Sequence, residues 1–313
     1  MYGVKLYAVP ENLDATIELW HRLKFDTLFI GQGCKNDSAF LERLQHEGFF
    51  VNLVEPVFLP GDDVQVSDSL LSVTKDGLPA RDTWVRFICP SNEEWLSSFY
   101  SRLESDAKLN ISSLSLDFIR FFQFWEVINP EDNSVKLTET CFCPKCTEQR
   151  KKFSSDEEWR VSVINSVAEK SREIIRKTDA GKKMGLHTVP WKKSTFDGAA
   201  RRVLGQDLEA LSKYVDFFTP MTYHHMMGTK VSYIGELLED FYSRTDSKIP
   251  IIPSVQLKKY YREEDISIQE NLETIKTGLQ YGKNNLVFFQ WKDIEQNKEI
   301  TALLESFAET IDK

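Results

Sequence analysis

The sequence contains no long hydrophobic run. None of its stretches approaches the ~20 consecutive apolar residues that a membrane-spanning helix requires. The first residues, MYGVKLYAVPENLD, also lack the basic head and the apolar stretch of a signal peptide. We therefore expect no membrane association and a cytoplasmic location for the chain as written; removal of a leader would instead indicate a secreted or periplasmic protein.

Basic residues are too few for a typical nucleic-acid-binding protein. The 313 residues contain 39 lysines and arginines against 48 aspartates and glutamates, a net charge of −9, and the pI is near 5.3. A protein that grips phosphate backbones normally carries a basic face. The GxGxxG and GxxxxGK phosphate-binding motifs are absent after the first apolar run. We expect no nucleic-acid partner and no organic cofactor.

What the sequence does contain is a regular alternation of predicted strands and helices. Eight apolar runs indicate strands, at residues 4–10, 26–32, 49–58, 111–122, 182–190, 216–226, 249–256 and 285–291. Helical periodicity follows each run, at residues 12–23, 38–47, 92–109, 156–177, 206–214, 231–243, 266–281 and 298–311. Eight units of about 39 residues predict a (β/α)₈ TIM barrel as a single domain over residues 1–313. A doubly wound open sheet is the alternative.

Two long insertions follow the third and fourth predicted strands, at residues 59–89 and 125–155. The first contains Asp76-Gly77, a hairpin-turn signal between short β-prone runs, which predicts a small two-stranded flap. Loops that follow the strands of a barrel lie on its C-terminal face, where active sites are built. Both insertions are therefore expected beside the active site.

Three of the five cysteines form a C-x-C-x-x-C cluster, Cys141, Cys143 and Cys146, in the second insertion. This spacing places three thiolates around one point, as a tetrahedral zinc ion requires. Cys89 ends the first insertion on the same face and is the candidate fourth ligand of a structural zinc. Disulfides, free thiols or an empty site are the alternatives. Cys34 is expected to be a partly buried thiol.

Polar residues at the C-terminal ends of barrel strands point at the ligand. Asp117 is the strongest candidate, because a carboxylate inside the apolar run LSLDFIRFF is costly unless it is paired or used. Arg120 is either its partner in a structural ion pair or a substrate contact. Pairing would lower the pKa of Asp117, which suits a nucleophile or a base.

A glycosidase needs a second carboxyl group, ~5 Å from the first for retention or ~6.5–9.5 Å for inversion. Glu126 lies just beyond the fourth strand, beside Trp125, whose ring would raise the pKa of an acid by desolvation. Glu55, at the end of the third strand, is the other candidate. The alternatives are a solvated loop glutamate for Glu126 and a hydrogen-bonded anchor of the flap for Glu55.

The remaining strand-end residues are side chains that carbohydrate sites use, namely amides, imidazoles and aromatic rings. Tyr223 and His224 are awkward as core and natural as ligand contacts, whereas His225 is expected to point away by strand alternation. His187 is either a substrate contact or a core histidine, and Trp291 either stacks on a sugar ring or packs in the barrel. The predicted substrate contacts are Arg120, Trp125, His187, Tyr223, His224, Gln256, Gln290 and Trp291, and Gln32 also lies at a strand end.

Short motifs resemble glycoside hydrolases. The pairing of CPSN at residues 89–92 with CFCPKC at residues 141–146 resembles family 42 β-galactosidases, which implies a zinc ion held by Cys89, Cys141, Cys143 and Cys146. The segment DFIR at Asp117 resembles family 10-like hydrolases. The M-x-Y that ends at Tyr223 and the terminal Trp291 resemble family 18 chitinases.

The catalytic residues of these families do not all carry over. Family 42 enzymes have an Asn-Glu acid at the fourth strand and a glutamate nucleophile at the seventh, where this chain has Asp117 and Gln256. The sequence thus predicts a glycosidase that acts on a glycan or oligosaccharide by carboxylate acid/base chemistry centred on Asp117. The alternatives are an inactive sugar-binding barrel that has lost its second carboxylate, or a lyase or isomerase that uses Asp117 and His187.

Overall fold

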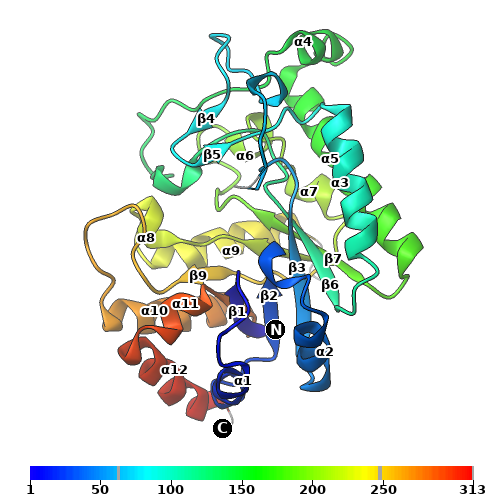
Figure 1. The fold of residues 1–313 in the computed structure, drawn as a ribbon. Helices are drawn as coiled ribbons and strands as arrows, with labels where there is room; N and C mark the ends of the chain where they lie inside the picture. The colour runs from blue at the N-terminus through cyan, green and yellow to red at the C-terminus, as the bar shows by residue number, and fades with distance from the viewer. Residues whose placement is uncertain (62–63, 246–248, 312–313) are drawn as a thin grey trace.

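The computed structural model describes residues 1–61, 64–245 and 249–311, and its centre is an eight-stranded parallel sheet (Figure 1). The strands are β1 (Tyr2–Leu6), β2 (Thr27–Ile30), β3 (Phe50–Pro56), β6 (Ser113–Asp117), β7 (Lys183–Thr188), β8 (Phe217–Pro220), β9 (Ser254–Gln256) and β10 (Leu286–Phe289). Their order is β8-β7-β6-β3-β2-β1-β10-β9. Phe218 closes the barrel between β8 and β9, because its N–H donates to the Pro250 carbonyl (3.0 Å) and its carbonyl accepts from the Ile252 N–H (2.8 Å). The predicted TIM barrel is confirmed.

Helices surround the strands in Figure 1. The longer ones are α1 (Leu13–Arg22), α2 (Ser38–His46), α3 (Glu93–Asp106), α5 (Asp156–Thr178), α9 (Ser232–Arg244), α10 (Ile268–Tyr281) and α12 (Lys298–Ile311). Their starts follow local chemistry, since Asn12, Asp37, Asn92, Ser155 and Ser267 each accept a first-turn backbone N–H with their side chains. Among the described helices, none has both the length and the apolar character of a membrane span.

The two insertions lie together at the top of Figure 1. The first contains β4 (Arg81–Asp82) and β5 (Val85–Arg86), and it also has the expected turn, with Gly77 at φ +79° and the Thr74 N–H donating to the Leu78 carbonyl (2.8 Å). The two-stranded sheet therefore lies just beyond the predicted turn. The second contains α4 (Pro144–Arg150). The Phe142 N–H joins the insertions by donating to the Val73 carbonyl (2.8 Å).

Several predicted elements are shorter than expected, and two of them bear on the candidate site. The sixth strand of the barrel, β8, ends at Pro220, and residues 224–227 form the short helix α8 (His224–Met227), which stops at Gly228 in a left-handed conformation. The prediction that His225 points away from the site assumed the alternation of a strand, and that assumption does not apply because His225 lies in a helix. The helix predicted at residues 206–214 is only the single turn α7 (Leu208–Leu211). The preceding short helix α6 (Ala199–Arg202) was not predicted, and Gly205, at φ +73°, separates the two.

Apolar side chains fill part of the barrel interior. Phe29, Val54, Phe217, Ile252 and Val287 form a cluster separate from the main core. A Cβ atom on Gly185 would lie 2.1 Å from the Phe217 ring. The absence of a side chain at this position of β7 is therefore what makes room for Phe217.

We expect Gly185→Ala to lower the free energy of unfolding by about 1–3 kcal/mol, since the new methyl group must displace a buried ring. Gly181→Ala is the control: its nearest neighbour would be 3.4 Å away, and its effect should stay within about 0.5 kcal/mol. Chemical denaturation measures both. Equal stabilities of the two variants would contradict this account of the barrel interior.

Candidate active site and cysteine cluster

A cavity of about 640 Å³ lies over the C-terminal ends of the strands. Of the predicted site residues, it brings together Asp117, Glu126 and Tyr223, with Gln32 beside them. Its other polar and aromatic lining was not predicted from the sequence. These residues are Lys5, Tyr7, Trp84, Phe118, Tyr260, Tyr261 and Phe289.

Asp117 ends β6 and is 7% exposed. Its Oδ1 accepts a hydrogen bond from the Phe118 N–H (2.7 Å), at a backbone position with φ +52°. Burial raises the pKa of the Asp117 carboxyl, and the nearby charges of Lys5 and Arg120 oppose this shift. The lowering of this pKa that pairing with Arg120 would produce is therefore not seen, because desolvation outweighs the positive charges.

Arg120 does not pair with Asp117 in the part of the chain that the structure describes. Its Nη1 donates instead to the carbonyls of Phe121 (3.3 Å) and Gln123 (2.8 Å), and its guanidinium lies 4.6 Å from the centre of the Phe87 ring. The side chain is fully buried and absent from the cavity lining. Arg120 therefore braces the segment between Asp117 and Glu126.

Glu126 is only 8% exposed, so it is not a solvated loop residue. It lies in a single 3₁₀ turn, η3 (Trp125–Val127). Burial raises the pKa of Glu126 to about 7, Arg120 opposes the shift, and the charge of Asp117 adds to it. Its Oε2 has no hydrogen-bond partner among the described residues. The cavity therefore contains two buried carboxyl groups that influence each other.

Glu55 is directed away from the cavity, which is lined instead by its neighbours in β3, Val54 and Pro56. Its Oε1 accepts from Gln32 Nε2 (2.9 Å) and its Oε2 from Arg102 Nε (3.5 Å). Burial raises the pKa of Glu55 to about 8, and a hydrogen bond with Asp106 adds to the shift. Glu55 is thus a hydrogen-bonded anchor and not the second acid of the cavity.

Below the cavity, His187 belongs to the barrel core. Its Nε2 lies 3.0 Å from Ser115 Oγ, and its Nδ1 lies 3.4 Å from Lys5 Nζ. Burial and the charge of Lys5 hold the pKa of His187 well below its usual value. The ring is therefore neutral, and its place outside the cavity lining weighs against a lyase or isomerase that uses His187 for proton transfer.

Two further predicted contacts have structural partners. His224 Nε2 lies 2.9 Å from Glu270 Oε1, and the His224 side chain is buried. Gln256 accepts a hydrogen bond from the Met226 N–H (3.0 Å) and donates to the Lys258 carbonyl (2.9 Å). Both residues therefore position α8 and the loop after β9, outside the cavity lining.

The predicted aromatic platforms are also buried in packing. Trp125 stacks on Tyr223 with ring centres 6.0 Å apart, and Trp291 packs edge-on against Trp20 at 5.5 Å. Gln290 Nε2 donates to the hydroxyl of Tyr260 (3.0 Å), which itself lines the cavity. Trp125 and Gln290 support lining residues from behind. Trp291 packs against helix α1 and is not available for stacking.

Aromatic side chains form the rim of the cavity. Trp84, 42% exposed, follows β4, and its Nε1 donates to the hydroxyl of Tyr261, 49% exposed, in the loop after β9 (2.7 Å). Phe124 packs edge-on against both rings, at 6.2 and 5.4 Å. Trp84 and Tyr261 come from segments 177 residues apart in the sequence, so no local pattern could have predicted their contact.

The four predicted cysteines come together in the insertions. The Sγ atoms of Cys89, Cys141, Cys143 and Cys146 all lie within 4.8 Å of one another. The Cys89 sulfur lies 3.4, 3.6 and 3.8 Å from those of Cys146, Cys141 and Cys143. Four thiolates ~2.3 Å from a tetrahedral zinc would be about 3.8 Å apart. No disulfide joins them, and the donor set fits a structural metal. Cys34 is buried and separate.

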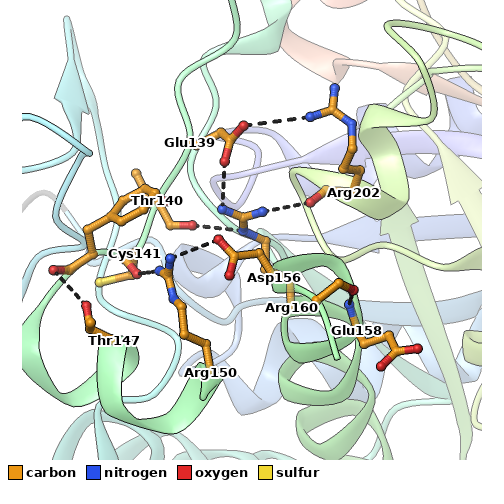
Figure 2. Close-up of polar contacts among 11 residues, drawn as sticks. Glu139, Thr140, Cys141, Thr147, Arg150, Asp156, Glu158, Arg160 and Arg202 are labelled. Carbon is orange, nitrogen blue, oxygen red and sulfur yellow. Dashed lines mark hydrogen bonds and ion pairs between the residues drawn. The ribbon is translucent and has the colours of Figure 1, made fainter. Parts of the chain in front are cut away.

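Two arginines hold the backbone of the cluster (Figure 2). Arg160 in α5, fully buried, donates from Nε to the Thr140 carbonyl (3.0 Å) and pairs with Glu139 (3.1 Å). Arg150 in α4 donates to the Cys141 carbonyl and pairs with Asp156 (2.9 Å). The backbone carbonyls of Thr140 and Cys141 are therefore held by one helix outside the insertion, α5, and by one inside it, α4.

Comparison with solved structures identifies the fold. No protein-family model matches the sequence, and no curated protein matches it. The glycoside hydrolase domain of PgaB (BpsB) from Bordetella bronchiseptica has a TM-score of 0.68 at 12% identity, over 97% of each chain. The β-galactosidase from Marinomonas ef1 has a TM-score of 0.71 at 11% identity. The alignment covers all of this chain and 60% of the β-galactosidase chain. Gan42B, a GH42 β-galactosidase from G. stearothermophilus, has a TM-score of 0.68 at 10% identity. The alignment covers 98% of this chain and 56% of the Gan42B chain.

This chain therefore spans less than two thirds of the β-galactosidases and nearly all of the PgaB domain. At such low identity these similarities establish the barrel and not an activity. The resemblance of the Asp117 segment to family 10-like hydrolases stays a prediction.

The raised pKa of Glu126 predicts a pH-dependent cost of folding. The folded state binds this proton more tightly than the unfolded chain, so Glu126 lowers stability progressively as the pH rises from about 4.5 to about 7. Glu126→Gln removes this loss. Relative to wild type, the variant should gain roughly 2–3 kcal/mol more at about pH 8 than at about pH 4, measured by chemical denaturation. The exposed Glu131→Gln is the control, and a pH-independent difference for Glu126→Gln would contradict the prediction.

Proposed function

We propose that this protein is a glycoside hydrolase that acts on a glycan or oligosaccharide. The observation that carries the proposal is that two buried carboxyl groups, Asp117 and Glu126, share one aromatic-lined cavity at the C-terminal face of the barrel. Catalytic groups of TIM barrels occupy this face, and paired carboxyls are the chemistry of glycosidic bond cleavage. The structural similarity to glycoside hydrolases supports the same reading.

The surroundings of the two carboxyls favour different roles. Glu126, with a pKa of about 7 and an unpartnered oxygen, is the candidate acid that protonates the leaving group. Asp117 receives a backbone N–H and faces the charge of Lys5, both of which favour its carboxylate form. It is the candidate nucleophile or base. The rim rings of Trp84 and Tyr261 offer apolar faces on which pyranose rings can stack.

The cysteine cluster is proposed to hold a structural zinc. Four thiolates leave no open coordination position for a substrate, and the four cysteines are absent from the cavity lining. The residues themselves join the first insertion, through Cys89, to the second, through the other three. The metal would therefore stabilise the loops around the cavity and take no part in the chemistry.

We expect Asp117→Asn and Glu126→Gln to lower the hydrolysis of glycosides with unactivated leaving groups by at least about 10³-fold each. Each substitution removes one member of the carboxyl pair. The loss in Glu126→Gln should be much smaller for aryl glycosides with activated leaving groups, which need no proton. Initial rates on a panel of aryl glycosides and oligosaccharides measure both effects, with Glu131→Gln as the control.

Equal residual rates in wild type and Asp117→Asn would contradict the catalytic role of Asp117. Glycan binding by the wild type without any hydrolysis would instead favour the sugar-binding barrel. The two functions are therefore separated by measuring affinity and turnover on the same panel.

The zinc proposal predicts about one equivalent of metal per purified chain, because four thiolates complete one tetrahedral site. Cys143→Ser should lower both the zinc content, measured by elemental analysis, and the thermal unfolding midpoint. Cys34→Ser, which removes a thiol outside the cluster, should keep the full equivalent. Wild-type protein with well under half an equivalent would contradict the proposal.

A further inference from the structure

Lys5 is a buried cation that the proposed function does not yet use. It is the second-last residue of β1, its side chain lines the cavity, and it is only 1% exposed. Removing an ammonium group from water is expensive unless other groups replace the solvent. Its presence inside the barrel therefore calls for a physical reason.

A chain of hydrogen bonds fixes the Lys5 ammonium group. Nζ lies 3.4 Å from Nδ1 of the neutral His187, and it donates to the Tyr223 hydroxyl (3.3 Å). Because an ammonium group can only donate, His187 Nδ1 is the acceptor in the first contact. His187 is held in turn by Ser115 Oγ (3.0 Å), and Tyr223 by Ser254 Oγ (3.0 Å). An ammonium group has three N–H donors, and two of them are engaged by protein side chains. The third is available on the cavity side.

We propose that Lys5 is a positioning residue of the active site, whose ammonium group keeps Asp117 ionised beside the protonated Glu126 and offers one N–H to the bound ligand. The inference rests on the proposed function for the role of Asp117. It assigns to Lys5 an electrostatic role and no direct share in bond cleavage. Two carboxyls and one ammonium also leave the cavity near neutrality when Glu126 is protonated, which suits an uncharged sugar ring.

The charges around Asp117 support this assignment. The groups that face it are Lys5 from β1, Tyr7 just after β1, Arg120 and Glu126 from the segment after β6, and Tyr223 after β8. Lys5 opposes the burial-driven rise in the pKa of Asp117 more strongly than Arg120 does. Burial lowers the pKa of Lys5 to about 8, so its charge is present at neutral pH. Loss of that charge must therefore raise the pKa of Asp117.

The direct test is the titration of Asp117 in the full-length chain. Carbon-13 NMR of protein labelled at the aspartate side-chain carboxyl carbon reports it, and the signal missing from Asp117→Asn identifies it. Lys5→Met removes the charge and the donors, whereas Lys5→Gln keeps amide donors for His187. In both, the midpoint should rise by at least about one pH unit, a tenfold weaker acid. The exposed Lys183→Met should leave it unchanged.

A midpoint within ~0.3 pH unit of wild type in a folded Lys5 variant would overturn the inference. If neither variant folds, the wild type decides: the Asp117 signal should respond a second time as Lys5 loses its proton near pH 8, and a flat response there would overturn the inference equally. Hydrolysis is not part of this readout. An inactive protein with the expected titration shift would overturn the proposed function and leave the role of Lys5 standing.

Discussion

The interior of a closed eight-stranded barrel holds only a few side chains from each strand, and each of them must either pack or find a hydrogen-bond partner. Inside the present barrel, some side chains pack and others form hydrogen bonds. Phe29 and Phe217 belong to an apolar cluster. Ser115, His187 and Lys5 form a hydrogen-bonded chain that reaches the cavity. The position and charge of the cavity floor therefore depend on polar groups that are almost completely buried.

The walls of the cavity depend on a second set of contacts, outside the barrel. Cys89 and Trp84 belong to one short segment. Because the cysteine cluster holds Cys89 in place, it also limits the movement of Trp84. Arg150 and Arg160 attach the other half of the cluster to helices α4 and α5. The cluster thus acts on the proposed active site only by positioning the loops around it. None of the four cysteines lines the cavity, yet the hairpin beside Cys89 carries the rim ring of Trp84, which contacts Tyr261.

The barrel, the insertions and the four clustered cysteines could be predicted because each has a local signal, such as periodicity or the C-x-C-x-x-C spacing. Most strand-end side chains could not be placed, because a one-residue change in where a strand ends alters which side chains reach the cavity. Gln256 and His224 are taken up by hydrogen bonds that only the folded chain reveals. Lys5 was missed although it interrupts an apolar run just as Asp117 does. The signal was present, but a lysine can also reach solvent with its long stem.

In the proposed mechanism, the different roles of Asp117 and Glu126 come from their neighbours and not from residue type. Burial raises the pKa of both carboxyls. A backbone N–H and the Lys5 charge then favour the ionised form of Asp117, whereas Glu126 keeps an oxygen without a partner. A buried, unpartnered carboxyl costs stability, and a barrel that only bound sugars could hold a hydroxyl with a neutral amide instead. The unequal pair is therefore better explained by proton transfer than by binding alone.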